Sequence, residues 1–414
     1  MNTLIAIILY LCIFPKYTSS ESIPIKSESH ERNIIIDLNA CFSKSQTVCL
    51  SEIADSVTFV PFETTKQSLM AEGQKYMTFS IPYIFYNGKC FDWNGKFYGT
   101  IVKKGQGQYE EFDGGALVYN ENHFYSKGSK FIEYDMNGKP TGKMKNLFAT
   151  REFQANDFLR NGTSFTSVGN YFMVYDYPGT IYFFNKNFEM VSSRVVIHDD
   201  LSSSKANAPS DCKFATFYQD TTIFYNFSND TIFHVSDTTL KPRWIVKFDH
   251  PLRLSNQVLR EEKNYFPDLA KAFNSGSSVE NIDYIKKTDH KHRVLSIYET
   301  EKQVFFLMKE ILLMAELRKK TTPSPYIVIY DKKTDQVIRV KGNGFVDDLL
   351  GMDFFYPQLG VFDQKMISYI WPHELFDYIE ECTKQKREVS PKLLSLSKKV
   401  DVEDNPILIL IHLK

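Results

Sequence analysis

The stretch MTFSIPYIFYNGKCFDWNGKFYGTIV, Met77–Val102, decides the fold of this chain. It consists of short aromatic and β-branched runs, and Asn-Gly pairs separate the last three of them at Asn87-Gly88 and Asn94-Gly95. Asn-Gly is the dipeptide that two-residue hairpin turns prefer, because both central residues of such turns need a positive φ. The stretch therefore predicts a meander of antiparallel hairpins.

The same unit returns along the chain. Its strands begin near positions 91, 134, 184 and 233, which gives a period of about 43 to 50 residues. Repeats of this length with four strands each are typical of propeller blades, and the alternation and the turn residues exclude a helical solenoid. The second to fifth copies are predicted over His123–Lys139, Tyr171–Asn187, Thr222–Phe248 and Val294–Val340.

A sixth blade has to come from Gly360–Ile370 together with the two ends of the chain. Pro406–Leu413 is an apolar terminal strand, and Ile34–Leu38 and Val57–Val60 are predicted strands near the start. Joining the two ends in one blade closes the ring and removes open sheet edges. We therefore expect an all-β chain, with one six-bladed β-propeller of four-stranded antiparallel blades over residues 21–414.

Helical segments interrupt this pattern. Pro251–Lys287 is predicted to be a helical insertion carried on one blade. His373–Thr383 and Pro391–Lys399, the latter capped by Ser390, are predicted as surface helices before the final strand. Lys309–Lys320 has a helix-forming composition but follows a strand, so it is either a long hairpin strand or a short helix.

Residues 1–20 are predicted to be a signal peptide. Leu4–Phe14 is an apolar run of 11 residues, too short to span a bilayer, and small polar residues follow it. An uncleaved anchor is the next alternative. Lipidation at Cys12 is disfavoured because bulky Tyr10 and Leu11 precede it. No later segment approaches membrane-spanning length, so we expect an exported chain, in the periplasm, at the cell surface or secreted.

The composition excludes some classes of partner. The chain has 414 residues, 43% hydrophobic and 24% charged, which suits a globular fold. Lys and Arg total 49 against 50 Asp and Glu, a net charge of −1, so a nucleic-acid-binding surface is not expected. We expect a monomer.

Five of the six cysteines remain after signal removal, so at least one lacks an intramolecular partner. Cys41 and Cys49 are eight positions apart, and a small disulfide loop between them is the most economical pairing. The alternative is two unpaired thiols.

Four segments carry a resemblance to a known family. They are Ser56–Thr65, Phe91–Phe112, Ile329–Thr334 and Asp404–Lys414. They resemble the six-bladed β-propeller family of exported Bacteroidetes proteins, which is similar to NHL-type propellers. The resemblance implies an envelope or secreted propeller, and it supplies no reaction, because most members have no established activity.

The family's Gly-rich element after the first blade usually reads G-x-G-P-G-E-Y. Here the matching loop contains Gly105, Gly107, Tyr109 and Glu110; it lacks the proline and inverts the final pair. A phosphate-binding loop needs a strand before its glycines and a helix after them. This loop leads instead to acidic residues, so we interpret it as an inter-blade turn.

No motif identifies a cofactor, metal or catalytic site. His290 and His292 could share a metal at positions i and i+2, but no third ligand is visible. Trp93, Tyr177 and Trp371 could stack on sugar rings. No cofactor, catalytic residue or metal ligand is predicted.

We therefore expect a non-catalytic binding or interaction module that engages an unknown glycan or protein partner at the loop face around the central channel. The alternative is a propeller-fold hydrolase or lyase acting on glycans. A cluster of His, Asp, Glu or Arg from separate blades, with perturbed pKa values, would favour the enzyme. A third possibility is that Pro251–Lys287 and the C-terminal helices dock a membrane partner.

Overall fold

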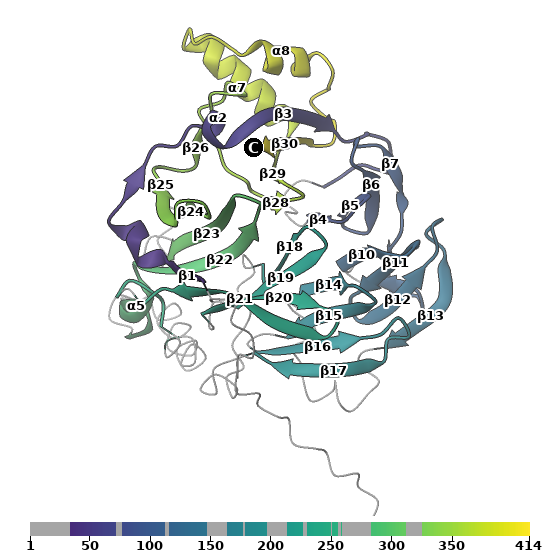
Figure 1. The fold of residues 1–414 in the computed structure, drawn as a ribbon. Coiled ribbons are helices and arrows are strands. Elements are labelled where there is room, and N and C mark those ends of the chain that lie inside the picture. The colour runs from purple at the N-terminus through teal and green to yellow at the C-terminus, as the bar shows by residue number, and fades with distance from the viewer. Residues whose placement is uncertain are drawn as a thin grey trace, which may run out of the picture. The chain divides into compact units, whose positions relative to one another are not determined.

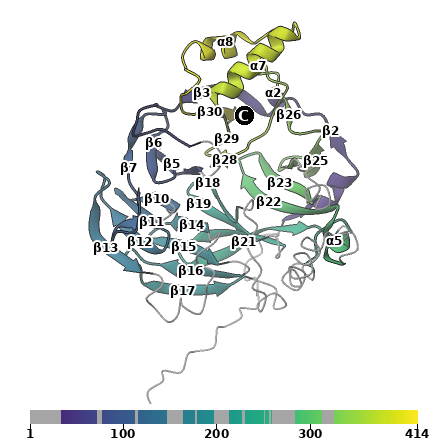
Figure 2. The same ribbon diagram turned by 180° about the vertical axis from the view of Figure 1, so that it is seen from behind.

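Six sheets, antiparallel apart from one added outer strand in each of two of them, make up most of the described chain (Figures 1 and 2). The structure is a computed structural model. It describes residues 34–71, 77–111, 116–146, 164–176, 179–196, 213–226, 230–249, 251–255, 258, 283–311 and 325–414. All six sheets belong to one unit, Asn33–Lys414.

The first three blades in chain order are four-stranded, and their strands follow one another in sequence. The first contains β4 (Met77–Phe79), β5 (Tyr83–Tyr86), β6 (Lys89–Asp92) and β7 (Phe97–Thr100). The second contains β10 (Ala116–Asn120), β11 (His123–Lys127), β12 (Lys130–Tyr134) and β13 (Pro140–Asn146). The third contains β14 (Ser164–Val168), β15 (Tyr171–Asp176), β16 (Thr180–Phe184) and β17 (Met190–Val195).

The last three blades include strands from the chain ends. The fourth contains β18 (Ala215–Tyr218), β19 (Thr221–Tyr225), β20 (Thr231–Ser236) and β21 (Thr239–Lys247). The fifth contains β22 (Lys291–Glu299), β23 (Gln303–Ile311), β24 (Tyr326–Asp331) and β25 (Gln336–Val340). The sixth has the order β28 (Gly360–Phe362), β29 (Lys365–Ile370), β30 (Ile407–Leu413) and β3 (Ala54–Pro61).

The sixth blade closes the ring as the sequence predicts. The C-terminal strand β30 lies between β29 and the N-terminal strand β3, with Val57 opposite Ile411 and Val60 opposite Leu408. The six-bladed all-β propeller with four-stranded blades is therefore confirmed.

Ile34–Leu38 does not join that closing blade. Instead, β1 (Ile34–Asp37) runs parallel to the outer edge of β21, and β2 (Ser45–Gln46) runs parallel to the outer edge of β25. The 3-10 helix η1 (Leu38–Phe42) connects them, and the short helix α2 (Leu50–Ile53) leads into β3. We call residues 34–49 the N-terminal strap, because they cross the outer edges of two blades before entering the sixth.

Aromatic side chains hold neighbouring blades together. Successive residues of a strand face opposite sides of its sheet. The ring centre of Phe124 on β11 lies 5.9 Å from that of Phe85 in the first blade. The ring centre of the next residue, Tyr125, lies 4.5 Å from that of Phe172 in the third blade. All four rings are nearly fully buried. This arrangement explains why the repeat is so rich in Phe and Tyr.

The two helices predicted near the C-terminus are present beside the sixth blade (Figure 1). They are α7 (Pro372–Lys384) and α8 (Pro391–Ser397), and Ser390 caps α8 by accepting a hydrogen bond from the N–H of Lys392. Their apolar faces join the core through Leu375, Leu393 and Leu396. Neither these helices nor any other within the described ranges is long and apolar enough to cross a membrane.

Two predicted segments are only partly described. Helix α5 (Asp283–Thr288) lies at the end of the predicted insertion, and residues 259–282 lie outside the described residues. Residues 309–311 continue strand β23, while 312–320 also fall outside. Two small sheets complete the fold: β8 (Lys103–Lys104) with β9 (Glu110–Glu111), and β26 (Phe345–Val346) with β27 (Phe354–Phe355).

Candidate functional site

The two faces of the ring differ in the length of their chain connections. On one face, two or three residues join the first strand of each blade to the second, and two to five join the third to the fourth where the chain is continuous. We call this the hairpin face. On the opposite face, 15 to 43 residues lead from the outermost strand of one blade to the innermost strand of the next. We call this the long-loop face.

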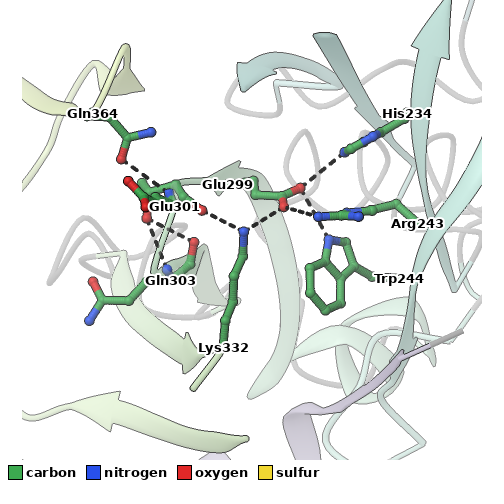
Figure 3. Close-up of polar contacts among 9 residues, drawn as sticks. His234, Arg243, Trp244, Glu299, Glu301, Gln303, Lys332 and Gln364 are labelled. Atoms are coloured by element: carbon green, nitrogen blue, oxygen red, sulfur yellow. Dashed lines mark hydrogen bonds and ion pairs between the residues drawn. The ribbon is translucent and has the colours of Figure 1, made fainter. Parts of the chain in front are cut away.

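The main charged cluster of the hairpin face surrounds Glu299, at the end of the innermost strand β22 (Figure 3). Its carboxylate is buried, with the side chain 1% exposed. One oxygen accepts from Lys332 Nζ at 2.7 Å and Arg243 Nη2 at 3.1 Å. The other lies 3.2 Å from Trp244 Nε1 and 3.3 Å from His234 Nε2.

This cluster links three consecutive blades. His234 and Arg243 come from the fourth blade and Glu299 from the fifth. The backbone N–H of Glu301, in the β22–β23 hairpin, donates to the side-chain oxygen of Gln364 in the sixth blade at 3.2 Å (Figure 3). The cluster therefore fixes the relative position of these blades at one face.

Lys332 reaches the cluster because of its place in the blade repeat. It follows Asp331 in the turn after the third strand, and Asp331 accepts hydrogen bonds from the backbone N–H groups of Lys333 and Thr334. The ammonium of Lys332 also donates to the carbonyl of Thr300 at 2.6 Å and lies 4.7 Å from the centre of the Tyr218 ring.

In the first blade, Trp93 occupies the same turn position, directly after Asp92. Its ring stacks on Phe362 of the sixth blade at 5.5 Å, and its indole N–H donates to the carbonyl of Ser80. Trp93 therefore packs between blades, as does Lys332, and the predicted role in sugar stacking has no support from this placement.

The surroundings of Glu299 keep it ionised. Burial by itself would raise the pKa of this carboxyl, but hydrogen bonds from His234 and Lys332, together with the charges of Lys332 and Arg243, outweigh it and lower the pKa from 4.5 to about 2. A general acid or base works best with a pKa near the working pH. Glu299 is thus suited to hold cations in place and poorly suited to transfer a proton.

The predicted Gly-rich loop lies on the long-loop face, between the first and second blades. The N–H of Gly107 donates to the Glu110 carboxylate at 3.0 Å, and the N–H of Glu110 donates back to the carbonyl of Gly107 at 3.1 Å. The N–H of Gly105 donates to the carbonyl of Glu111, and Tyr109 accepts at its carbonyl from the hydroxyl of Tyr134. The loop is closed on itself by these contacts.

Glu111, next to this loop, is a buried carboxylate that the sequence analysis does not single out. It accepts from the backbone N–H and hydroxyl of Ser129 and from the N–H of Lys130, in the turn between β11 and β12. A Cβ on Gly128 would lie 2.3 Å from its carboxylate oxygen. Glu111 therefore fixes this turn to the inter-blade loop, which agrees with a structural role.

The two histidines considered as metal ligands, His290 and His292, differ in exposure and in hydrogen-bond partners. His290 is exposed and lies 2.8 Å from Glu310, whereas His292 is buried with its Nδ1 2.9 Å from the hydroxyl of Tyr326. Within the described ranges, no three His, Cys, Asp or Glu side chains gather closely enough to hold a metal ion.

Cys41 and Cys49 are both free thiols in the structure, so it does not contain the disulfide expected between them. Cys41 is buried in η1 beside the fourth and fifth blades, and burial raises its pKa to about 12. Cys49 precedes α2, and its backbone forms an isolated parallel β-bridge with Val346. The strap between them is held by strand pairing instead.

Of the other aromatic candidates, Trp371 precedes α7 and stacks on His373 with ring centres 6.4 Å apart. Tyr177 lies outside the described residues. The sequence patterns do not reveal the Glu299 cluster. The signal available was a histidine within a strand pattern and a glutamate at the end of another.

Comparison with known proteins gives a family match and a structural match. The family model described as "Domain of unknown function (DUF4934)" matches residues 33–412. A crystallised protein described as a "Putative exported protein" from Bacteroides fragilis superposes with a TM-score of 0.59 at 15% identity. That match covers 92% of this chain and 99% of the other. At this identity it supports the fold alone.

Other solved structures match more weakly. BamB from Moraxella catarrhalis has a TM-score of 0.29 at 10% identity, covering 69% of this chain and 66% of its own. The Pan2 WD40 domain of Neurospora crassa has a TM-score of 0.33 at 10% identity, covering 70% and 73%. No curated protein matches this chain.

Proposed function

The chain belongs to the DUF4934 family, and we propose that it is an exported, non-catalytic binding module of the cell envelope. Its ligand, a glycan or another envelope protein, would engage the long-loop face around the axis of the ring. The observation that carries this proposal is the difference between the two faces. One face has only short hairpins, and the other receives every inter-blade connection of 15 to 43 residues.

Long connections supported by a rigid scaffold are where binding residues concentrate in proteins. Each of these six connections leads into the innermost strand of a blade, next to the axis, so a ligand over the axis on this face would be within reach of every blade. Such a composite site requires no local sequence motif. This agrees with a chain whose sequence shows a clear fold and no catalytic signature.

The alternative of a glycan-acting enzyme would need a proton-transfer group among residues from separate blades. The Glu299 cluster meets the first requirement, because its side chains come from two separate blades, the fourth and the fifth. Its chemistry does not suit the role, because four donors occupy the carboxylate and its pKa is lowered to about 2. The cluster favours a rigid ring over a reaction centre.

Export is part of the proposal. It is supported by the apolar segment Leu4–Phe14 at the start of the chain and by the fold shared with a protein described as exported. Secretion of the full chain, with N-terminal sequencing of the product, would place the cleavage site. We expect cleavage near residue 20.

The binding proposal is tested by a thermal-shift screen of residues 21–414 against mono- and oligosaccharides, with divalent metals and a chelator as further arms. A ligand that prefers the folded state raises Tm. A saturable shift with one saccharide class, without turnover of that compound, supports a glycan-binding module. A shift with turnover would overturn the non-catalytic assignment. If no compound shifts Tm, the ligand is instead expected to be a protein, and photo-crosslinking in intact cells then tests for that partner.

A further inference from the structure

Five Asn-Gly pairs occur in the chain, and four of them lie within the described residues, at Asn87, Asn94, Asn137 and Asn343. An asparagine before glycine readily loses its side-chain amide, because glycine has no side chain to hinder attack of its backbone nitrogen on the amide carbon. Whether a given pair reacts depends on how firmly the fold holds that nitrogen. The structure separates the four pairs on this basis.

The pairs at Asn94 and Asn137 are exposed, but their turns hold the glycine. In each turn the glycine N–H donates at 3.0 Å to the carbonyl of an aspartate, Asp92 in one and Asp135 in the other. The side chain of the same aspartate accepts the N–H of the asparagine at 2.8 Å. The attacking nitrogen is therefore already bonded, and the turn cannot rotate without breaking two hydrogen bonds.

The pair at Asn87 is held in a different way. Asn87 is half-buried, with a φ of +50°, in the two-residue turn between β5 and β6. The carbonyl of its glycine accepts the backbone N–H groups of Ile101 at 2.8 Å and Val102 at 3.1 Å. This turn is fixed to the following loop.

Asn343 lies in a segment without these restraints. It is exposed between two glycines, and a Cβ on Gly342 would meet nothing within 4 Å. Among the described residues, none accepts a hydrogen bond from the N–H of Gly344. Gly344 is buried, and a Cβ there would lie 2.3 Å from the carbonyl oxygen of Phe355. Its nitrogen therefore stays in place while the chain before it is able to turn.

Hydrogen bonds on either side show that the chain loops out at Asn343. The N–H of Lys341 donates to the carbonyl of Gln46 in the strap at 2.8 Å, and the N–H of Val346 donates to that of Val48 at 3.0 Å. The strap advances by two residues between these bonds, whereas the segment that contains Asn343 advances by five. The extra residues are a bulge outside the strand pairing.

We propose that Asn343 is a site of spontaneous modification, for which the chain supplies the nucleophile and water is the co-reactant. The backbone nitrogen of Gly344 forms a bond to Cγ of Asn343, and the Cγ–Nδ2 bond breaks. The proton of the attacking nitrogen leaves with the amide nitrogen as ammonia, and a cyclic imide remains. Water then adds to one imide carbonyl. Addition at Cγ gives aspartate, and addition at the backbone carbonyl gives isoaspartate.

The product changes the contact between this segment and the strap. Either form adds a negative charge, and isoaspartate also lengthens the backbone by a methylene group between the bonds to Gln46 and Val48. Both hydrogen bonds depend on the position of this segment, so the modification makes them open more often. The proposal is independent of the ligand at the long-loop face.

Peptide mapping by mass spectrometry tests the site, with residues 21–414 incubated folded in mildly alkaline buffer. Asn343 should be converted about tenfold faster than Asn94 or Asn137, because reaction at those turns first requires two hydrogen bonds to break. In urea the three rates should become similar. Equal rates in the folded chain would overturn the proposal. A preference for Asn343 that persists in urea would also overturn it, because the fold would not be the cause.

Hydrogen exchange tests the effect on the strap. After conversion of Asn343, the amides of Lys341 and Val346 should exchange several times faster than in the fresh chain. The amides of Ile101 and Val102, which also donate to a turn, should not change. Asn343→Ser cannot form the imide and should keep its original exchange through the same incubation. Unchanged exchange at Lys341 and Val346 in the converted chain would overturn the effect on the strap.

Discussion

At the scale of single residues, Glu299 is the acceptor on which four donors from two blades depend. Removing its charge leaves the mostly buried Lys332 and the partly exposed Arg243 without their counter-charge. We predict that Glu299→Gln lowers the free energy of unfolding by about 3 kcal/mol. Urea unfolding followed by fluorescence measures this. The matched change Glu301→Gln, at an exposed position of the same hairpin, should have little effect.

We also predict that the contribution of Glu299 to stability depends on pH. The folded-state pKa of Glu299 is lowered from 4.5 to about 2. Its stabilising contribution is therefore complete above about pH 4.5 and is lost as the pH falls toward 2. The difference in stability between the unchanged chain and Glu299→Gln should shrink over that range. A difference that stays constant from pH 7 to pH 2 would show that the lowered pKa is not the source of the stability.

At the scale of elements, the sequence places both Asn-Gly turns of the first blade, but only Asn87-Gly88 forms the expected two-residue turn. Four residues join β6 to β7, and there only Gly95 of the Asn94-Gly95 pair has a positive φ. Gly95 has a φ of +82°, and a Cβ there would lie 2.3 Å from the carbonyl oxygen of Pro61. We predict that Gly95→Ala costs about 2 kcal/mol of stability. Gly99→Ala, where a Cβ meets nothing within 4 Å, should be tolerated. Equal melting temperatures for the two variants would contradict this.

The innermost strands of the second to fourth blades could not be predicted in the same way. Strands β10, β14 and β18 are only four or five residues long, and long connections of variable composition precede them. Within the strap, Ile34–Leu38 was predicted correctly as a strand but wrongly as part of the closing blade. Pairing of Ile34–Asp37 with β21 instead of the closing blade depends on contacts more than 200 residues apart in the sequence.

At the scale of the whole molecule, the ring depends on its closing blade. A chain that ends at Asn405 lacks β30, which lies between β29 and β3. We predict that it does not unfold cooperatively. A chain that begins at Leu50 lacks only the strap and keeps all six blades, so it should fold with a lower Tm. Circular dichroism melting and limited proteolysis distinguish the two. Cooperative melting of the chain ending at Asn405 would refute the role of closure.

The sequence predicts the propeller because every blade repeats the same local signals. It does not predict the Glu299 cluster, because His234, Arg243, Glu299 and Lys332 belong to four segments of two blades that meet only after the ring forms. The long-loop face is similar in this respect. Its connections belong to six blades that are far apart in the sequence.

We propose above that this protein binds its ligand or partner through the long-loop face. The most direct test is photo-crosslinking in intact cells that produce the protein, with a photoreactive amino acid placed on each face in turn. Gln106 is exposed on the long-loop face, and Asp220 is exposed in a turn of the hairpin face. We predict a specific adduct at Gln106 and not at Asp220. If the thermal-shift screen identifies a saccharide ligand, that saccharide should reduce crosslinking at Gln106 and not at Asp220. An adduct confined to Asp220 would contradict the account.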